Sequence, residues 1–232
     1  MYFIGSGSLL IRAVTYAVKK GIGVKEVFVP DRDSYNRLVK LEVNAKILEN
    51  PAYDLKTALA GKDSSIIFSI NNELLISNEI LTLDHKFFNI HNGLVQKYRG
   101  IAEICILAAI KNKETNYGVT LHQILPNQRV DSGPVVDQII FDIKDLSFEG
   151  IIKQSFNELV NIFELNIDNI INDHFLLHEV ALSSKSYSYS DLNELCINFS
   201  GAEIKKIFNL GSLSMFFPKL KTELDKIIKN NE

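Results

Sequence analysis

Short apolar runs of strand length alternate with segments of helical period along residues 1–141, and this alternation restricts the fold more than any other feature of the sequence. The strand-like runs lie at residues 2–4, 24–29, 65–70, 87–90, 117–124 and 135–141. Segments typical of helices lie at residues 9–20, within 35–48, and at 101–111. Strands that alternate with helices predict a parallel sheet covered on both faces. We therefore expect an α/β, Rossmann-like fold with a mostly parallel sheet.

The remainder of the sequence predicts that the sheet ends in an antiparallel strand and that a short C-terminal extension follows. The last two strand-like runs leave no room for a helix between them, so that end of the sheet is expected to turn antiparallel. Ser147 can cap a long helix, whose apolar positions keep helical spacing at Ile152, Phe156, Leu159, Phe163 and Ile170. After about residue 180 the sequence becomes polar and serine-rich, with modest helices further on. We expect a main domain at residues 1–178 and a small C-terminal appendage at residues 179–232.

Composition excludes some classes of protein. With 232 residues, 46% of them hydrophobic, the chain can bury the core of one large domain. A net charge of −3 offers no basic face for a nucleic acid. No apolar run approaches the roughly 18 residues of a membrane span, and the N-terminal stretch is typical of a first strand rather than a signal peptide. Cys105 and Cys196 lie in separate apolar patterns and are expected to be buried and reduced, which fits a cytoplasmic protein.

A glycine-rich turn, Gly5-Ser6-Gly7-Ser8, follows the first strand and precedes a helix. This arrangement points backbone N–H groups and a helix N-terminus outward, where they can bind an anion. Leu10 stands where the dinucleotide fingerprint requires its third glycine, so an NAD site is not expected. Two interpretations stay open: a phosphate-binding turn, or a tight turn that simply needs glycine.

Other reactive residues form no recognisable motif. His174 and His178 have the i, i+4 spacing that can bind a metal, but a surface pair is the favoured interpretation because no H-E-x-x-H pattern accompanies them. The two cysteines make no C-x-x-C, and no G-x-S-x-G elbow is present. We expect no metal site and no serine-hydrolase chemistry.

Asn89 and His91 end a strand-like run, and Asp131 lies in a loop just before another. In α/β sheets the ligand binds beyond the carboxyl ends of the strands, where such loops converge. An amide donor, a titratable ring and a carboxylate can together stabilise an oxyanion and move a proton during acyl transfer. The alternative is that the asparagine and the aspartate only cap the ends of strands.

The stretch FNIHNGLVQKYRG, followed by YGVTLHQILPNQRVDSGPVVDQ, resembles the folate-dependent formyltransferases, which include glycinamide ribonucleotide and methionyl-tRNA formyltransferases. The resemblance spans roughly residues 1–175, so that the main domain would be the catalytic one. It implies that Asn89, His91 and Asp131 form the catalytic trio. It also implies that the formyl group of 10-formyltetrahydrofolate is transferred to a primary amine.

The same resemblance implies where the substrates bind. The pterin would be held from two sides, by Leu74, Leu75 and Ile76 and by Leu125, Pro126, Asn127 and Val130. The acceptor would be held by Gly5, Ser6, Gly7, Ser8 and Tyr98. The chain departs from the family in one loop, since Leu-Pro is common where Val95-Gln96 stand, and Pro-Ser where Asn92-Gly93 stand. Because proline fixes φ, its absence is expected to loosen this loop.

The acceptor is expected to be an amino sugar carried on a nucleotide, because the tail is faintly similar to the short extensions of the sugar enzymes. We expect neither a nucleic-acid nor a membrane partner, and a homodimer stays open. His122 stays open too, as support for the site or as part of the core. The alternatives are an amino acid or carrier-bound amine of a secondary-metabolite pathway as acceptor, a formyltetrahydrofolate hydrolase, and a nucleotide-binding module without activity.

Overall fold

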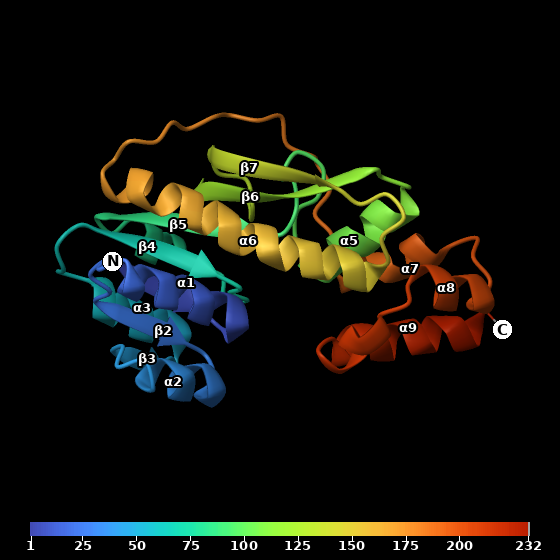
Figure 1. The fold of residues 1–232 in the computed structure, drawn as a ribbon, viewed down its shortest axis with the longest axis horizontal. Coiled ribbons are helices and arrows are strands. Elements are labelled where there is room, and N and C mark those ends of the chain that lie inside the picture. Colours follow the sequence, from blue (N-terminus) through green and yellow to red (C-terminus); the bar gives the residue numbers. More distant parts are fainter. Residues whose placement is uncertain (232) are drawn as a thin grey trace. The chain divides into compact units, whose positions relative to one another are not determined.

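The computed structural model describes residues 1–231 and contains a seven-stranded sheet in the order β3-β2-β1-β4-β5-β6-β7 (Figure 1). The strands are β1 (Tyr2–Gly5), β2 (Glu26–Val29), β3 (Ala45–Ile47), β4 (Ser65–Ile70), β5 (His85–His91), β6 (Asn116–Ile124) and β7 (Val135–Asp142). The pairs β1–β2, β1–β4, β2–β3 and β4–β5 are parallel. The N–H of Gln123 donates to the carbonyl of Pro134 at 2.9 Å across a short connection, so β7 returns antiparallel to β6. The predicted α/β fold with a mostly parallel sheet is confirmed.

Polar caps decide where several helices begin. The helices are α1 (Gly7–Lys19), α2 (Arg32–Val39), α3 (Pro51–Leu59), α4 (Asn78–Leu81), α5 (Ala102–Lys111), α6 (Phe148–Ile171), α7 (Leu192–Cys196), α8 (Gly201–Ile207) and α9 (Pro218–Asn230), with 3-10 turns at Tyr189–Asp191 and Gly211–Met215. The Ser147 hydroxyl accepts from the N–H of Gly150 at 3.2 Å and caps α6, as predicted. The Asp31 carboxylate accepts from the N–H of Ser34 at 2.7 Å, so α2 begins before the predicted window.

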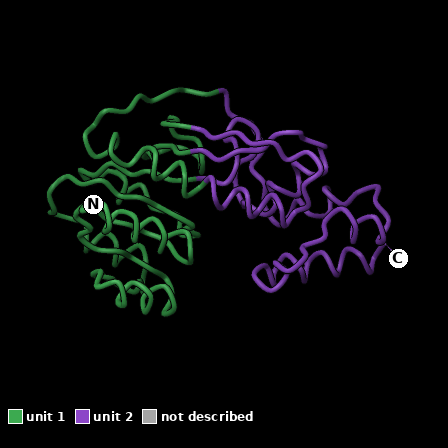
Figure 2. Tube along the Cα trace, viewed as in Figure 1, with its two compact units in different colours: residues 1–90, 121–137, 159–180 green, residues 91–120, 138–158, 181–232 purple. Residues whose placement is uncertain are grey.

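The chain divides into two compact units, coloured separately in Figure 2. The first unit contains residues 1–90, 121–137 and 159–180, and the second contains residues 91–120, 138–158 and 181–232. Residues 181–232 therefore belong to the same unit as α5. The boundary expected at residue 178 stays a prediction.

Alternating side chains fill both faces of the sheet in the first unit. Phe3 and Phe68 lie on one face, where their ring centroids are 6.0 and 5.1 Å from that of Phe163 on α6. The opposite face carries Tyr2, Ile4, Phe28, Ile67 and Phe87, which form one buried cluster with residues of α3 and α4. Because successive strand residues point to opposite faces, runs such as Ile67-Phe68 supply both layers at once.

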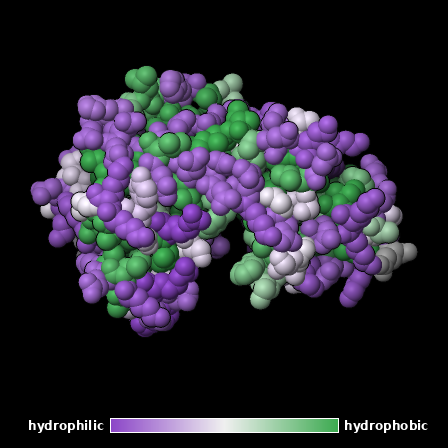
Figure 3. All heavy atoms as spheres, viewed as in Figure 1, coloured by the Kyte–Doolittle hydropathy of each residue, from purple (hydrophilic) through white to green (hydrophobic). Residues whose placement is uncertain are grey.

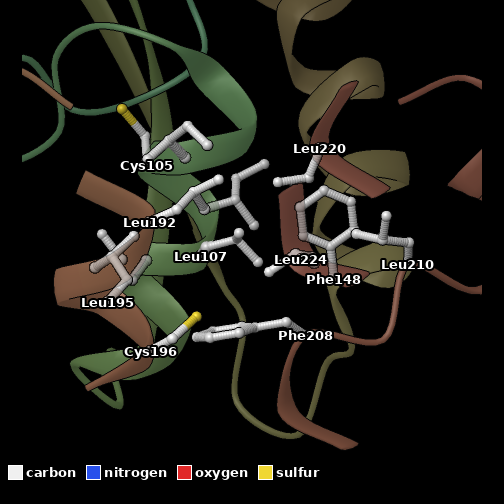
Figure 4. Close-up of a cluster of buried hydrophobic side chains, with 14 of the residues drawn as sticks. Cys105, Leu107, Phe148, Leu192, Leu195, Cys196, Phe208, Leu210, Leu220 and Leu224 are labelled. Carbon is white, nitrogen blue, oxygen red and sulfur yellow. The ribbon is translucent and has the colours of Figure 1, made fainter. Parts of the chain in front are cut away.

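The second unit is built around α5. Figure 4 shows Leu107 of α5 among side chains of the C-terminal helices, including Leu192 and Leu195 of α7 and Leu220 and Leu224 of α9. These residues belong to one cluster of buried apolar side chains. The polar C-terminal sequence thus supplies enough apolar positions to cover a helix that is itself almost wholly buried.

Surface properties add little about function. Hydrophilic residues cover most of the surface visible in Figure 3. None of the described helices combines the length and the apolar character that crossing a membrane requires.

Cys105 and Cys196 form no disulfide and are buried in the second unit, as expected. Burial raises the pKa of the Cys196 thiol to about 11, against a smaller opposing effect of Lys111. Thiolate is the reactive form, so neither thiol should react quickly with Ellman's reagent in the native protein. Both should react after denaturation in guanidinium chloride. A fast-reacting thiol in the native protein would show that this core is open to solvent.

Candidate active site

The carboxyl ends of β4 and β5 bring polar side chains to one edge of the sheet in the first unit. Phe87 and Phe88 are buried, and Asn89 is the first polar residue that follows them on β5. In the parallel register Asn89 is paired with Ser69 of β4, whose hydroxyl accepts from the side-chain amide of Asn72 at 3.2 Å. Ligands of α/β sheets bind beyond this edge.

Asn89, His122 and Asp131 meet there, although they come from β5, from β6 and from the loop that follows β6. The Nδ2 of Asn89 lies 3.2 Å from Nε2 of His122 and 3.3 Å from Oδ1 of Asp131. The remaining side of this triangle, from His122 Nε2 to Asp131 Oδ1, measures 3.6 Å. His122 is 2% and Asp131 is 9% exposed, so the three groups interact with little screening by water.

The hydrogen bonds of His122 determine its tautomer. Its Nδ1 lies 3.1 Å from the backbone carbonyl of Gln123, which can only accept, so Nδ1 carries a proton. In the neutral ring Nε2 is then an acceptor and takes one amide hydrogen of Asn89. The other amide hydrogen goes to Asp131. Both hydrogens of the Asn89 amide are therefore donated within this cluster.

The backbone of Asp131 lies in the left-handed region, with φ of 51°. Aspartate and asparagine adopt this conformation more readily than most residues because their short polar side chains can bond locally. The loop that presents the carboxylate is held further by the Ser132 hydroxyl, which donates to the carbonyl of Arg129 at 2.6 Å. Local backbone conformation thus aims Asp131 at Asn89.

His91 is the last residue of β5 and the first residue of the second unit. Two positions separate it from Asn89, so both side chains leave the strand on the same face. Its Nε2 lies 2.7 Å from the backbone carbonyl of Tyr98, and a carbonyl only accepts, so Nε2 carries the proton. The ring nitrogen that can gain or lose a proton is therefore Nδ1.

Tyr98, expected to bind the acceptor, has its ring in the core of the second unit. Its hydroxyl donates to Glu114 Oε1 at 3.0 Å and accepts from the amide of Asn112 at 3.2 Å. Burial raises the pKa of this phenol well above its ordinary value. The backbone carbonyl, rather than the phenol, is the group that Tyr98 turns toward a predicted catalytic residue.

The two segments expected to hold the pterin adjoin one another in the first unit. Asn78 accepts from the N–H of Asn127 at 2.9 Å and donates to the Asn127 side chain at 3.0 Å. On one side of this link, Leu74 and Ile76 pack against the core, whereas Leu75 is 73% exposed. On the other side, Val130 is 50% exposed, while Leu125 and Pro126 are partly buried. The expected pterin residues thus include two exposed apolar side chains on linked loops.

The Gly5-Ser6-Gly7-Ser8 turn supports both of its earlier interpretations. A side chain at Gly5 would bring a Cβ within 1.8 Å of the Ile70 carbonyl oxygen, so the close approach of β4 requires glycine. The N–H of Gly7 donates to the Ser34 hydroxyl at 2.9 Å. The guanidinium of Arg37 lies 3.4 Å from the Ser8 hydroxyl, which places a cation beside the start of α1. The anion-binding role stays a prediction.

The sequence left His122 undecided, and the geometry shows it in the cluster with Asn89. The sequence signal for His122 was its place near the end of a strand-like run. The direction of its ring depends on the register of β6, which the sequence does not show. The Asn78–Asn127 link had no signal in the sequence. Within residues 1–231 no three His, Cys, Asp or Glu side chains gather as metal ligands would.

Comparison with known proteins finds relatives in sequence. No protein-family model matches the chain. A methionyl-tRNA formyltransferase from Thermotoga neapolitana is 27% identical over 150 residues, which are 59% of this chain and 47% of that protein. The chain thus matches about half the length of this curated relative.

Solved structures share the fold. An N-formyltransferase from Helicobacter canadensis, in complex with folinic acid and dTDP-3-aminofucose, matches with a TM-score of 0.65 at 24% identity, over 82% of this chain and 71% of that one. The phosphoribosylglycinamide formyltransferase of Campylobacter jejuni matches with a TM-score of 0.61 at 21% identity, over 73% and 95%. The chain has the fold of the folate-dependent formyltransferases and is similar in sequence to one of them, so the resemblance that its motifs predicted is confirmed.

Proposed function

We propose that the chain is an N-formyltransferase that moves the formyl group of 10-formyltetrahydrofolate to a primary amine. The observation that carries this proposal is the hydrogen-bonded cluster of Asn89, His122 and Asp131, with His91 two residues beyond Asn89. The Helicobacter canadensis N-formyltransferase, solved with folinic acid, supports the choice of donor.

In this reaction the amine nitrogen attacks the formyl carbon and the carbonyl electrons move to oxygen. The bond between that carbon and N10 of the folate then breaks, the amine loses a proton and N10 gains one. Asn89 donates an amide hydrogen to the oxyanion. Both of its hydrogens are bonded inside the cluster, so one of them exchanges His122 or Asp131 for the oxyanion as charge develops.

His91 supplies the second donor. Its Nε2–H is committed to the Tyr98 carbonyl, so only Nδ1 can meet the reacting groups. Nδ1 donates to the oxyanion when the ring is protonated, and accepts a proton when the ring is neutral. Nδ1 can thus both donate to the oxyanion and accept a proton.

Asp131 acts as the base that takes the proton of the attacking amine, directly or through water. Its Oδ1 accepts from the Asn89 amide, which leaves the carboxylate oriented before the amine arrives. His122 acts as a positioning residue for Asn89, because its Nε2 accepts from the Asn89 amide and its Nδ1 is anchored to the backbone.

The linked loops around Leu75 and Val130 suit the pterin of the donor. Both side chains offer exposed apolar surface, and a flat ring gains free energy from covering it. The Asn78–Asn127 bonds hold the two loops together without a ligand, so the donor would not have to order them on binding. These residues fit a folate, and they supply binding rather than chemistry.

The acceptor we propose is an amino sugar carried on a nucleotide. The Gly5-Ser6-Gly7-Ser8 turn begins α1, and Arg37 lies beside it, which suits a phosphorylated substrate. The Helicobacter canadensis enzyme, which shares the fold, was solved with dTDP-3-aminofucose.

A side-by-side assay separates the acceptors. Folate-coupled turnover should be measured with 3-amino and 4-amino sugar nucleotides, hydroxyornithine and aminoacyl carriers. Turnover on a sugar nucleotide is the expected result. Turnover only on an amine without phosphate would contradict the proposed acceptor, and binding of nucleotide without any folate binding would indicate a module without activity.

Replacing Asn89 by alanine should lower kcat by about 10²–10³ because an oxyanion donor is lost. The affinity for the folate should hardly change, since this donor is used mainly in the transition state. Steady-state kinetics and a folate titration by calorimetry check both parts. Asn116→Ala, which changes an exposed amide at the start of β6, is the control. An unchanged kcat in Asn89→Ala would remove Asn89 from the mechanism.

Replacing Asp131 by asparagine should lower kcat by about 10²–10⁴, the usual contribution of a positioned acid or base. The backbone should tolerate the change, because asparagine also adopts positive φ. Asp145→Asn is a matched control: Asp145 is exposed and has a similar φ of 63°. Equal activity of the two variants would show that the Asp131 carboxylate takes no part in proton transfer.

A further inference from the structure

The loop after β5 curls back onto the ring of His91. The Tyr98 carbonyl meets Nε2 of His91 at 2.7 Å across this loop. Gly93 lies inside the curl, where a Cβ would stand 2.5 Å from the Tyr98 carbonyl oxygen and 2.7 Å from Nε2 itself. The hydrogen bond that fixes the His91 tautomer therefore depends on the path of residues 92–98.

Two glutamines far apart in sequence hold this path. The Gln96 amide donates to Gln138 Oε1 at 3.0 Å, and the Gln138 amide donates back to Gln96 Oε1 at 2.8 Å. Gln138 lies on β7, and both side chains are partly buried. Such a reciprocal pair satisfies the donor and the acceptor of each amide at once.

The network continues to the other end of the curl. The second hydrogen of the Gln138 amide goes to the Thr120 hydroxyl at 2.7 Å, and this buried hydroxyl donates to the Gly93 carbonyl at 2.7 Å. Residues 93 and 96 are thus both tied to the strands β6 and β7. The sequence predicted a loop loosened by missing prolines, whereas the structure shows one held by side-chain hydrogen bonds.

We propose that Gln96 and Gln138 are positioning residues for His91. Their amide pair keeps the loop in the path that sets the Tyr98 carbonyl against Nε2, so that Nε2 carries the proton and Nδ1 is the unprotonated nitrogen of the neutral ring. The effect of the glutamine pair on catalysis rests on the proposed formyl transfer, whereas its effect on the His91 tautomer does not. The glutamine pair restricts the loop through side-chain hydrogen bonds, whereas a proline at position 96 would restrict it by fixing φ.

The test is nitrogen NMR of histidine-labelled protein at about pH 8.5, where an ordinary imidazole is neutral. The His91 signal is assigned with His91→Asn. Wild type should show the Nε2–H tautomer alone, because the partner of one ring nitrogen sets the tautomer. Gln138→Leu and Gln96→Leu should each show a mixture of both tautomers. Gln154→Leu, which removes an amide bonded to Glu158 on α6, should resemble wild type.

Kinetics of the same variants give the second readout. Each glutamine variant should lose about 10- to 100-fold in kcat, as typical for a group that orients a functional histidine, with both KM values within about twofold of wild type. The double variant should be little worse than either single one, because the two amides act as a unit. Gln96 stands on a loop, so Gln96→Leu keeps the test valid should Gln138→Leu fail to fold.

A pure Nε2–H tautomer in both variants would overturn the inference, and so would additive losses in log kcat. A wild-type protein that transfers no formyl group to any amine would contradict the proposed function instead. In that case the NMR comparison still decides whether the glutamine pair sets the tautomer.

Discussion

The side-chain amide of Asn89 has two hydrogens, and both are donated at the carboxyl edge of the sheet, one to His122 and one to Asp131. The cluster of Asn89, His122 and Asp131 depends on this sharing. The parallel register of β4 and β5 brings Asn89 to that edge, and the left-handed backbone at Asp131 aims the carboxylate at it. In the proposed reaction the oxyanion can accept from Asn89 only by displacing one of these partners, so the amide is oriented in advance but can still exchange its partner.

A backbone carbonyl fixes the tautomer of each of the two histidines, but the two carbonyls bind opposite ring nitrogens. A backbone carbonyl takes the Nδ1–H of His122, and another takes the Nε2–H of His91. Each carbonyl thereby decides which ring nitrogen is unprotonated in the neutral ring: Nε2 of His122, which accepts from Asn89, and Nδ1 of His91, which we propose acts on the substrates. The tautomers of the two histidines thus depend on the path of the backbone, at Gln123 on β6 for His122 and at Tyr98 for His91.

Much of this could be predicted, and the failures have physical reasons. The predicted strand at residues 65–70 coincides with β4, and Ser147 caps α6, because apolar runs and caps are local signals. β3 was missed because three half-buried residues carry no period. The buried ring of Tyr98 and the Gln96–Gln138 pair depend on contacts with distant parts of the chain, which no local pattern encodes.

The fate of the formyl carbon tests the account most directly. 10-Formyltetrahydrofolate labelled with ¹⁴C in the formyl group should be incubated with the protein, with and without an amino-sugar nucleotide, and the products separated. The account predicts that the label appears as an amide of the sugar when the amine is present and stays on the folate when it is absent. Release of labelled formate at the same rate in both mixtures would contradict transfer and indicate hydrolysis.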